Sequence, residues 1–392
     1  RDLRRLRSLV RRYVAQGRVT PEDLDQFSAA DHLIGPTIYT VVNQLIKPIT
    51  VKAGKVSWAL MLHPSGLACD LFVTHCWKEG VYEFVGKVLN SWPFWARHAY
   101  CCMLSNPQNL DITSLISRPR ESPFAKALSS ATYVLVVPNQ ACSIYSRIWC
   151  AYEAFLAYSE EKAIITAVAP DPRLKCQMVA SCLLYSIGFC VCWLALRPES
   201  MAIYEASLIA GEVGIVALSL IRPSWITLPF EFLLILLAGV VAGLCIDQLL
   251  YQILVWGFLE MENGSVWVFV FNWLPLTMSV AAVFTTFDRV QAMRVDEEAH
   301  QLQHQYTGRL REAIASEPAD KEAILAELVE SGLEQRVEEA VQVLLDSGLS
   351  TPSMRAATKR AGRLVQAGQW RLSSVIAVWS WWLWQGVCPL AL

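Results

Sequence analysis

Apolar and polar positions alternate in blocks through the first half of the chain, and these blocks predict strands followed by helices. Four apolar runs have the length of strands and end in polar or turn residues, as is typical of strands buried on both faces of a sheet. These runs are residues 70–75 (DLFVTH), 99–104 (AYCCML), 132–138 (TYVLVVP) and 163–168 (AIITAV). Between them the pattern predicts helices over 83–90, 123–130 and 146–158. The alternation indicates a parallel sheet covered on both faces by helices.

Residues 1–68 are interpreted as a basic, partly helical lead-in to this α/β domain. Residues 1–18 carry seven Arg among Leu and Val. They predict either a basic amphipathic helix lying on anionic lipid or the solvated face of an ordinary helix. Thr20 and Pro21, followed by two acids, predict a second helix that runs to about residue 30. Glycines and prolines between Gly35 and Gly54 predict an irregular segment.

The chain becomes much more apolar from residue 171. Overall it is 54% hydrophobic and only 17% charged, whereas soluble domains usually carry about 25% charged residues. Four apolar runs predict a four-span α-helical membrane region over 171–287, with the lipid bilayer as a partner. They are 176–196, 202–221, 232–258 and 264–287. Basic residues at their ends predict a multipass integral membrane protein whose α/β domain faces the cytosol. The pattern leaves the organelle open.

Three acids interrupt the apolar runs: Glu205, Glu212 and Asp247. Acids inside a membrane could line an ion or proton path, which would favour a channel or transporter. Alternatively, Glu205 lies near the interface and a lone acid only holds neighbouring helices together.

Residues 288–372 predict a cytosolic helical region. The segments 327–333 (ELVESGL) and 343–349 (VLLDSGL) recur, with Gly332 and Gly348 as expected helix ends. This pattern predicts a small helical array that could dock protein partners. Residues 373–392 are uncharged and rich in Trp, so they predict either a fifth span or an interfacial anchor.

Composition also limits the cofactors and partners. The formal net charge of -2 does not decide whether the chain binds nucleic acid, but no basic-aromatic patch is present, so we expect no nucleic-acid partner. The twelve Cys form no CxxC pair, which favours buried thiols in a reducing compartment over a zinc site. His300 and His304 lie one helical turn apart, but no third ligand accompanies them. Solvated histidines are therefore the favoured interpretation, and we predict no metal site.

The most informative stretch is the helix predicted over 146–158. Trp149 and Glu153 are four residues apart and therefore share one face near its start. In parallel sheets this edge, where strands end and helices begin, is the usual ligand crevice. An aromatic ring and a carboxylate there could stack a flat ring and hold a ribose. Alternatively, Trp149 packs on the sheet, and Glu153 either interacts with the helix dipole or is solvated.

Two further side chains near this edge are candidates for substrate contact. His75 follows the first strand and could contact a phosphate, although a partly buried histidine beside Trp77 is the favoured alternative. Arg147 could meet a phosphate at the helix start, or it could pair with a carboxylate such as Glu153 or Glu160.

The motifs in this region resemble those of Toll/interleukin-1 receptor homology (TIR) domains. The segments DLFVTHCW, SSATYVLVVPN and SRIWCAYEA carry the resemblance, and the last matches the W-C-x-x-E signature. The domain over 69–170 is most similar to divergent TIR-like domains joined to multipass membrane regions in unicellular eukaryotes. The loop after the second strand departs from the family because it contains no Gly, and Thr74 stands where Ser is commoner.

The resemblance implies a flavodoxin-like fold, together with either signalling by self-assembly or cleavage of NAD at the nicotinamide–ribose bond. Glu153 would be catalytic, and Trp149, His75, Thr74 and Arg147 would contact the substrate. NAD would be a substrate, with no separate cofactor. The leading expectation is thus a membrane-anchored TIR-like signalling protein and candidate NAD hydrolase. A non-enzymatic self-assembling scaffold is the alternative, and a channel or transporter gated by this domain is the third.

Overall fold

A computed structural model of the 392-residue chain describes residues 1–111, 113–141, 144–170, 172–195, 228–256, 298, 309–315, 318–332, 334–347 and 349–351. The chain divides into two compact units. The first joins Arg1–Pro170 to Val295–Gly368, and the second joins Asp171–Arg294 to Gln369–Leu392.

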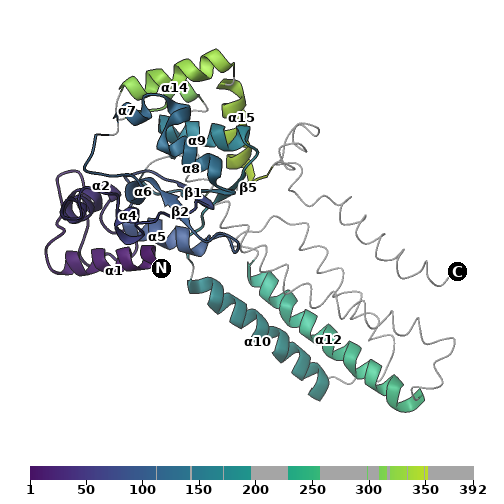
Figure 1. The fold of residues 1–392 in the computed structure, drawn as a ribbon. Coiled ribbons are helices and arrows are strands. Elements are labelled where there is room, and N and C mark those ends of the chain that lie inside the picture. Colours follow the sequence, from purple (N-terminus) through teal and green to yellow (C-terminus); the bar gives the residue numbers. More distant parts are fainter. Residues whose placement is uncertain are drawn as a thin grey trace. The chain divides into compact units, whose positions relative to one another are not determined.

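The first unit is built on a five-stranded sheet (Figure 1). The strand order is β2-β1-β3-β4-β5, and the first four strands are parallel. The strands are β1 (Leu71–Thr74), β2 (Ala99–Cys101), β3 (Tyr133–Val136), β4 (Ala163–Thr166) and β5 (Leu349–Ser350). The predicted parallel α/β sheet is therefore confirmed, and its order 2-1-3-4 is consistent with a flavodoxin-like or TIR-like fold. The short β5 adds antiparallel to β4.

Side chains of the strands alternate between two hydrophobic cores, one on each face of the sheet. In β1, Phe72 belongs to one core, and Leu71 and Val73 belong to the other. The same alternation separates Val134 from Leu135 in β3. Because both faces are buried, the strands are apolar throughout rather than alternating with polar residues.

Different helices cover the two faces of the sheet (Figure 1). The first face is packed by α8 (Pro123–Ser130), α9 (Ile148–Ser159), α14 (Pro318–Ser331) and α15 (Glu334–Ser347). The second is packed by α1 (Asp2–Ala15), α2 (Ile38–Val41), the π-helical turn η1 (Val42–Ile46), α4 (Trp58–Leu62) and α5 (Val81–Asn90). Both the N-terminal and the C-terminal segments therefore complete the cores of the α/β domain.

The N-terminal lead-in differs from its prediction in two places. Residues 20–30 form turns instead of a helix, because the carboxylate of Asp25 accepts hydrogen bonds from Thr37 and Thr40 and fixes an open loop. Thr37 then becomes the N-cap of α2. The segment expected to be irregular contains α2, η1 and α3 (Lys47–Lys52).

Shorter helical elements connect the strands and the C-terminal helices. They are α6 (Cys102–Ser105), α7 (Thr113–Ile116), η2 (Pro119–Glu121), η3 (Ile144–Ser146) and η4 (Leu310–Glu312). Between α14 and α15 the chain passes through Gly332, whose φ of 65° is the left-handed conformation expected of a glycine at a helix end.

The described part of the second unit is a pair of helices, α10 (Pro172–Ala195) and α12 (Leu228–Trp256). The helices meet at glycines. A Cβ atom added at Gly188 would lie 2.1 Å from the carbonyl oxygen of Leu236, and one added at Gly239 would lie 2.1 Å from that of Tyr185. Side chains at these two positions would force the helix backbones apart.

The prediction of a membrane-spanning region is wrong, because no helix among the described residues combines the length and apolar character needed to cross a bilayer. The expected spans 176–196 and 232–258 fall on α10 and α12. These helices carry polar residues along their length, including Ser181, Ser186, Glu231 and Asp247. Part of their apolar surface packs one helix against the other, with Cys192, Val241 and Leu244 buried between them. The predicted α-helical multipass fold class is therefore wrong. The integral-membrane localisation, and the orientation that was derived from it, are wrong for the same reason.

Several predictions concern residues outside the described ranges. These are the spans 202–221 and 264–287 with Glu205 and Glu212, the Trp-rich segment 373–392, and the pair His300 and His304.

Candidate functional site

The candidate site lies where β1 and β3 end side by side. Thr74 is the last residue of β1 and is paired with Val136, the last residue of β3. In the order 2-1-3-4 the chain leaves these two strands toward opposite sides of the sheet, and the crevice between such connections is the usual ligand site of doubly wound folds. Helix α9 follows the loop after β3 and brings Glu153 to this edge.

Glu153 points from α9 to the end of β1. Its side chain is buried, with the residue only 7% exposed, and Oε2 accepts a hydrogen bond from the Thr74 hydroxyl. Burial raises the pKa of Glu153 to about 8, although the Thr74 hydrogen bond and the charge of Arg147 act in the opposite direction. The carboxyl group is therefore mostly protonated at neutral pH in this conformation. Glu153 is neither solvated nor free to act on the helix dipole.

His75 is buried directly after Thr74. Its Nδ1 lies 2.9 Å from Glu79 Oε1, without hydrogen-bonding alignment, and its ring centre lies 4.7 Å from that of Phe84. Burial lowers the pKa of His75 to about 3 and raises the pKa of Glu79 well above its ordinary value. The two side chains therefore form a neutral pair, because a charge on either would lack water.

The other ring nitrogen of His75 contacts a thiol. Cys102 Sγ lies 3.3 Å from His75 Nε2, and Trp77 Nε1 donates to the same sulfur over 3.2 Å. Burial raises the pKa of Cys102 to about 12, so this Cys–His contact is a protonated thiol beside a neutral imidazole and not an activated nucleophile.

Arg147 is the N-cap residue of α9 and stands close enough to act through its charge. It lowers the pKa of both His75 and Glu153. Arg147 thus acts on Glu153 through its charge, whereas Lys87 is the positive group that acts on Glu79.

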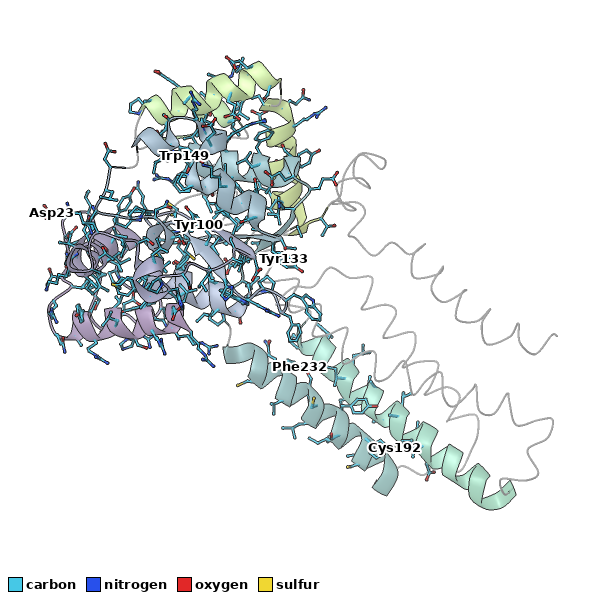
Figure 2. All side chains as sticks on the ribbon, in the orientation of Figure 1. Asp23, Tyr100, Tyr133, Trp149, Cys192 and Phe232 are labelled. Carbon is cyan, nitrogen blue, oxygen red and sulfur yellow. The ribbon has the colours of Figure 1, made fainter. Side chains whose placement is uncertain are left out.

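Trp149 is half-buried on the same helix but contacts a different set of groups (Figure 2). Its indole N–H donates to Asp320 Oδ2 over 2.9 Å, and its ring lies 5.1 Å from that of Phe124. Tyr152 packs edge-on against it. The indole therefore packs against α14, where the carboxylate of Asp320 accepts the hydrogen bond from its only donor.

Residues between 314 and 327 contact α9 at several points. Ile314 accepts from the backbone N–H of Ile148 and donates to the carbonyl of Ser146, so it is joined to the start of the helix. Tyr152 donates to Glu327 over 2.8 Å, and Glu327 also pairs with Arg120. The signature helix is thus enclosed by residues that follow it in sequence by more than 150 positions.

The structure therefore brings Thr74 and Glu153 into direct contact and places His75 and Arg147 around them, while Trp149 contacts other partners. Sequence patterns did not indicate Glu79, Cys102 or Asp320. Glu79 lies four residues after His75, a spacing that brings two side chains together on a helix. These residues form a loop, however, so the spacing alone did not predict the contact. No local signal connects Asp320 to Trp149.

The arrangement provides one carboxyl group with a perturbed pKa at a sheet crevice, which is a common property of functional sites. Among the described residues, no group of three His, Cys, Asp or Glu side chains could hold a metal ion. Comparisons with protein-family models, curated proteins and solved structures found no match to this chain. The motifs and the strand order remain the basis of the resemblance to TIR domains.

Proposed function

We propose that this chain is a TIR-like signalling protein that hydrolyses NAD at the nicotinamide–ribose bond, with Glu153 as the catalytic carboxylate. The observation that supports this best is the position of Glu153. It is a buried acid of perturbed pKa, held by Thr74 at the edge where β1 and β3 end side by side. The W-C-x-x-E match supplies the same residue independently of the geometry.

The chemistry needs the ionised form of Glu153. A nicotinamide riboside carries a positive charge, and an opposite charge at close range lowers the pKa of a carboxylic acid. The substrate itself would therefore help to ionise Glu153. The C1′–N bond then breaks and its electron pair goes to the nicotinamide nitrogen, while the carboxylate stabilises the cationic, oxocarbenium-like sugar. Water adds to C1′ and releases one proton, giving ADP-ribose and neutral nicotinamide.

Use of Trp149 as a stacking platform requires that α14 moves. Ile324 and Leu328 of α14 are buried, and Leu325 packs against the same core while partly exposed, so these side chains hold the helix together with the contacts of Asp320 and Glu327. Removing two such side chains from a core costs about 3–6 kcal/mol. Substrate binding, or a partner that binds α14, could offset this amount.

The experiment is nicotinamide release from NAD by the whole chain, held at high local density on beads. The whole chain is needed because α1, α14 and α15 complete the cores of the domain. The wild type is compared with Glu153→Gln, and Glu161→Gln serves as a matched control because Glu161 is exposed just beyond the same helix. Release by the wild type and by the control, but not by Glu153→Gln, is the expected result. If none of the folded proteins releases nicotinamide, the enzymatic proposal is wrong.

A non-enzymatic, self-assembling scaffold is the second candidate function. It is favoured by the neutral state of Glu153 and by the sheet edges. β5 covers the β4 edge, whereas β2 is the last strand on the other side and keeps Ala99 and Tyr100 partly exposed. An unpaired edge strand can pair with another chain. Concentration-dependent light scattering that is lost on Ala99→Pro, without any NAD cleavage, would select this function.

A further inference from the structure

Helix α1 has one face that is committed to its own domain. Leu3, Leu6, Val10 and Val14 are buried in the core beneath the sheet, with Leu6 and Val10 almost inaccessible. An amphipathic helix lies in a membrane interface by inserting its apolar face. That face of α1 is already occupied, so any ligand of this helix must be recognised by its polar side.

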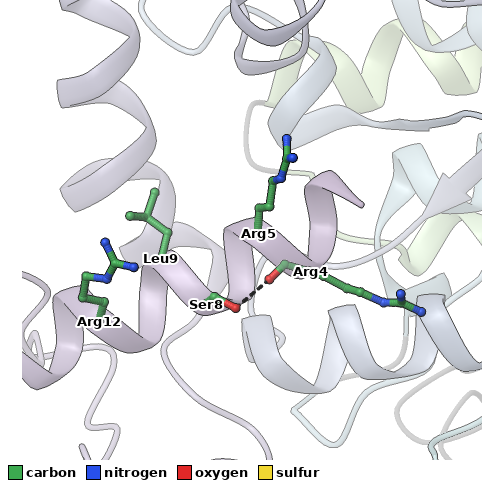
Figure 3. A pocket seen from close by; sticks show the side chains of 5 residues that line it. All are labelled: Arg4, Arg5, Ser8, Leu9 and Arg12. Carbon is green, nitrogen blue, oxygen red and sulfur yellow. Dashed lines mark hydrogen bonds between the residues drawn. The ribbon is translucent and has the colours of Figure 1, made fainter.

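The polar side of α1 contains a hollow of 410 Å³ lined by Arg4, Arg5, Ser8, Leu9 and Arg12 (Figure 3). Three of the five lining residues carry a guanidinium group, and none is acidic. The Ser8 hydroxyl donates to the carbonyl of Arg4 over 3.0 Å and lies on the same helix face.

The positive charge of this face is poorly balanced. Within the described ranges, the acid that pairs with an α1 arginine is Asp2, which lies 3.7 Å from Arg5 and is bound more closely by His63, at 2.9 Å. Burial and the charges of Arg11 and Arg4 lower the pKa of Arg7. Burial is the larger cause, and repulsion from the neighbouring guanidinium groups adds to it.

We propose that this hollow binds the phosphate groups of an anionic ligand through Arg5 and Arg12, which point to the same side of α1 in Figure 3, with Arg4 contributing at its edge. Guanidinium groups match phosphate oxygens with paired N–H donors and remain charged at every physiological pH. Arg5 and Arg12 are two helical turns apart, so they suit a ligand with more than one phosphate or a surface that presents several. The phosphates belong either to a soluble polyphosphate or to phospholipid headgroups. This site does not depend on the proposed NAD chemistry.

The first part of the test is binding of pyrophosphate to the whole chain by calorimetry at low ionic strength. The second is co-sedimentation with phosphatidylcholine vesicles, with and without phosphatidic acid. The double variant Arg5→Gln/Arg12→Gln should bind at least about tenfold more weakly, because two charge-assisted contacts are lost. Arg18→Gln is the control, since the guanidinium of Arg18 lies over the ring of Tyr13 and does not line the hollow.

Binding in the first part alone identifies a soluble phosphate ligand, and binding to acidic vesicles alone identifies headgroups. Either result supports the site if added salt weakens binding and Arg18→Gln behaves as the wild type. Absence of binding in both parts overturns the proposal. Equal binding by the double variant and the wild type overturns the assignment to this hollow. Matching thermal unfolding of the variants establishes that the changes have not altered the fold.

Discussion

The raised pKa of Glu153 makes a quantitative prediction about stability. In the unfolded chain this group has its ordinary pKa of 4.5, and in the folded chain the pKa is about 8. The folded state therefore binds the proton of Glu153 more tightly than the unfolded state does. This tighter binding stabilises the folded state in full at pH values below the unfolded pKa. The stabilisation is lost as pH rises toward the folded pKa. One pKa unit corresponds to about 1.4 kcal/mol, which gives a total loss of about 5 kcal/mol across this range.

Replacement of Glu153 by Gln removes the ionisation and keeps the shape of the side chain. The two proteins should have similar free energies of unfolding near the ordinary pKa of a glutamate. Above pH of about 8, the Gln variant should be more stable by several kcal/mol. The measurement is denaturant unfolding of both proteins over a pH series, followed by tryptophan fluorescence.

The difference between wild type and Glu153→Gln isolates this group, because both proteins share the other buried acids and His75. A wild type that stays as stable as the variant across the whole pH range would refute the reasoning. It would mean that Glu153 reaches water, or a counter-charge, in the native state. The matched control Glu161→Gln alters an exposed carboxylate and should show no such pH-dependent difference.

Three further predictions concern neighbouring groups. Thr74→Val removes a hydrogen bond that lowers the pKa of Glu153, so its loss of stability should begin at the same pH as in the wild type but continue to a higher pH in the same unfolding series. Cys102, whose pKa is raised to about 12, should resist iodoacetamide in the native protein, whereas the exposed Cys176 should react. Peptide mass spectrometry measures the alkylation of each cysteine, and faster alkylation of Cys102 than of Cys176 would contradict this prediction. Asp320→Ala removes the acceptor of the Trp149 indole, so hydrogen exchange in α14 should accelerate by about tenfold. An unchanged exchange rate would contradict a role for Asp320 in holding α14.

The strands and the central helices could be predicted from sequence because each signal is local. Continuous apolar runs of strand length identify strands buried on both faces, and the predicted run 132–138 contains β3. The helix predicted over 123–130 has the observed bounds, since Ser122 caps it and Pro123 occupies its first turn. The prediction of a helix over 20–30 failed because the side chain of Asp25 makes long-range hydrogen bonds that compete with helix formation.

The candidate site was only partly predictable for a related reason. Glu153 and Thr74 follow from the motif and from the rule that strand ends form the crevice. The residues that hold the side chains of α9 in place are distant from it in sequence. Asp320 binds Trp149, and Glu327 binds Tyr152. Hydrophobicity alone also failed to distinguish a helix that crosses a bilayer from one that packs against another helix, as α10 packs against α12.

The most direct test of Glu153 as the catalytic carboxylate is the pH dependence of kcat/KM for nicotinamide release by the whole chain. If the free protein must ionise a carboxyl group with a pKa of about 8, kcat/KM should rise about tenfold per pH unit below that value and level off above it. Glu153→Gln should release no nicotinamide at any pH, and Glu161→Gln should reproduce the wild-type profile. A flat profile, or activity that survives in Glu153→Gln, would contradict the assignment.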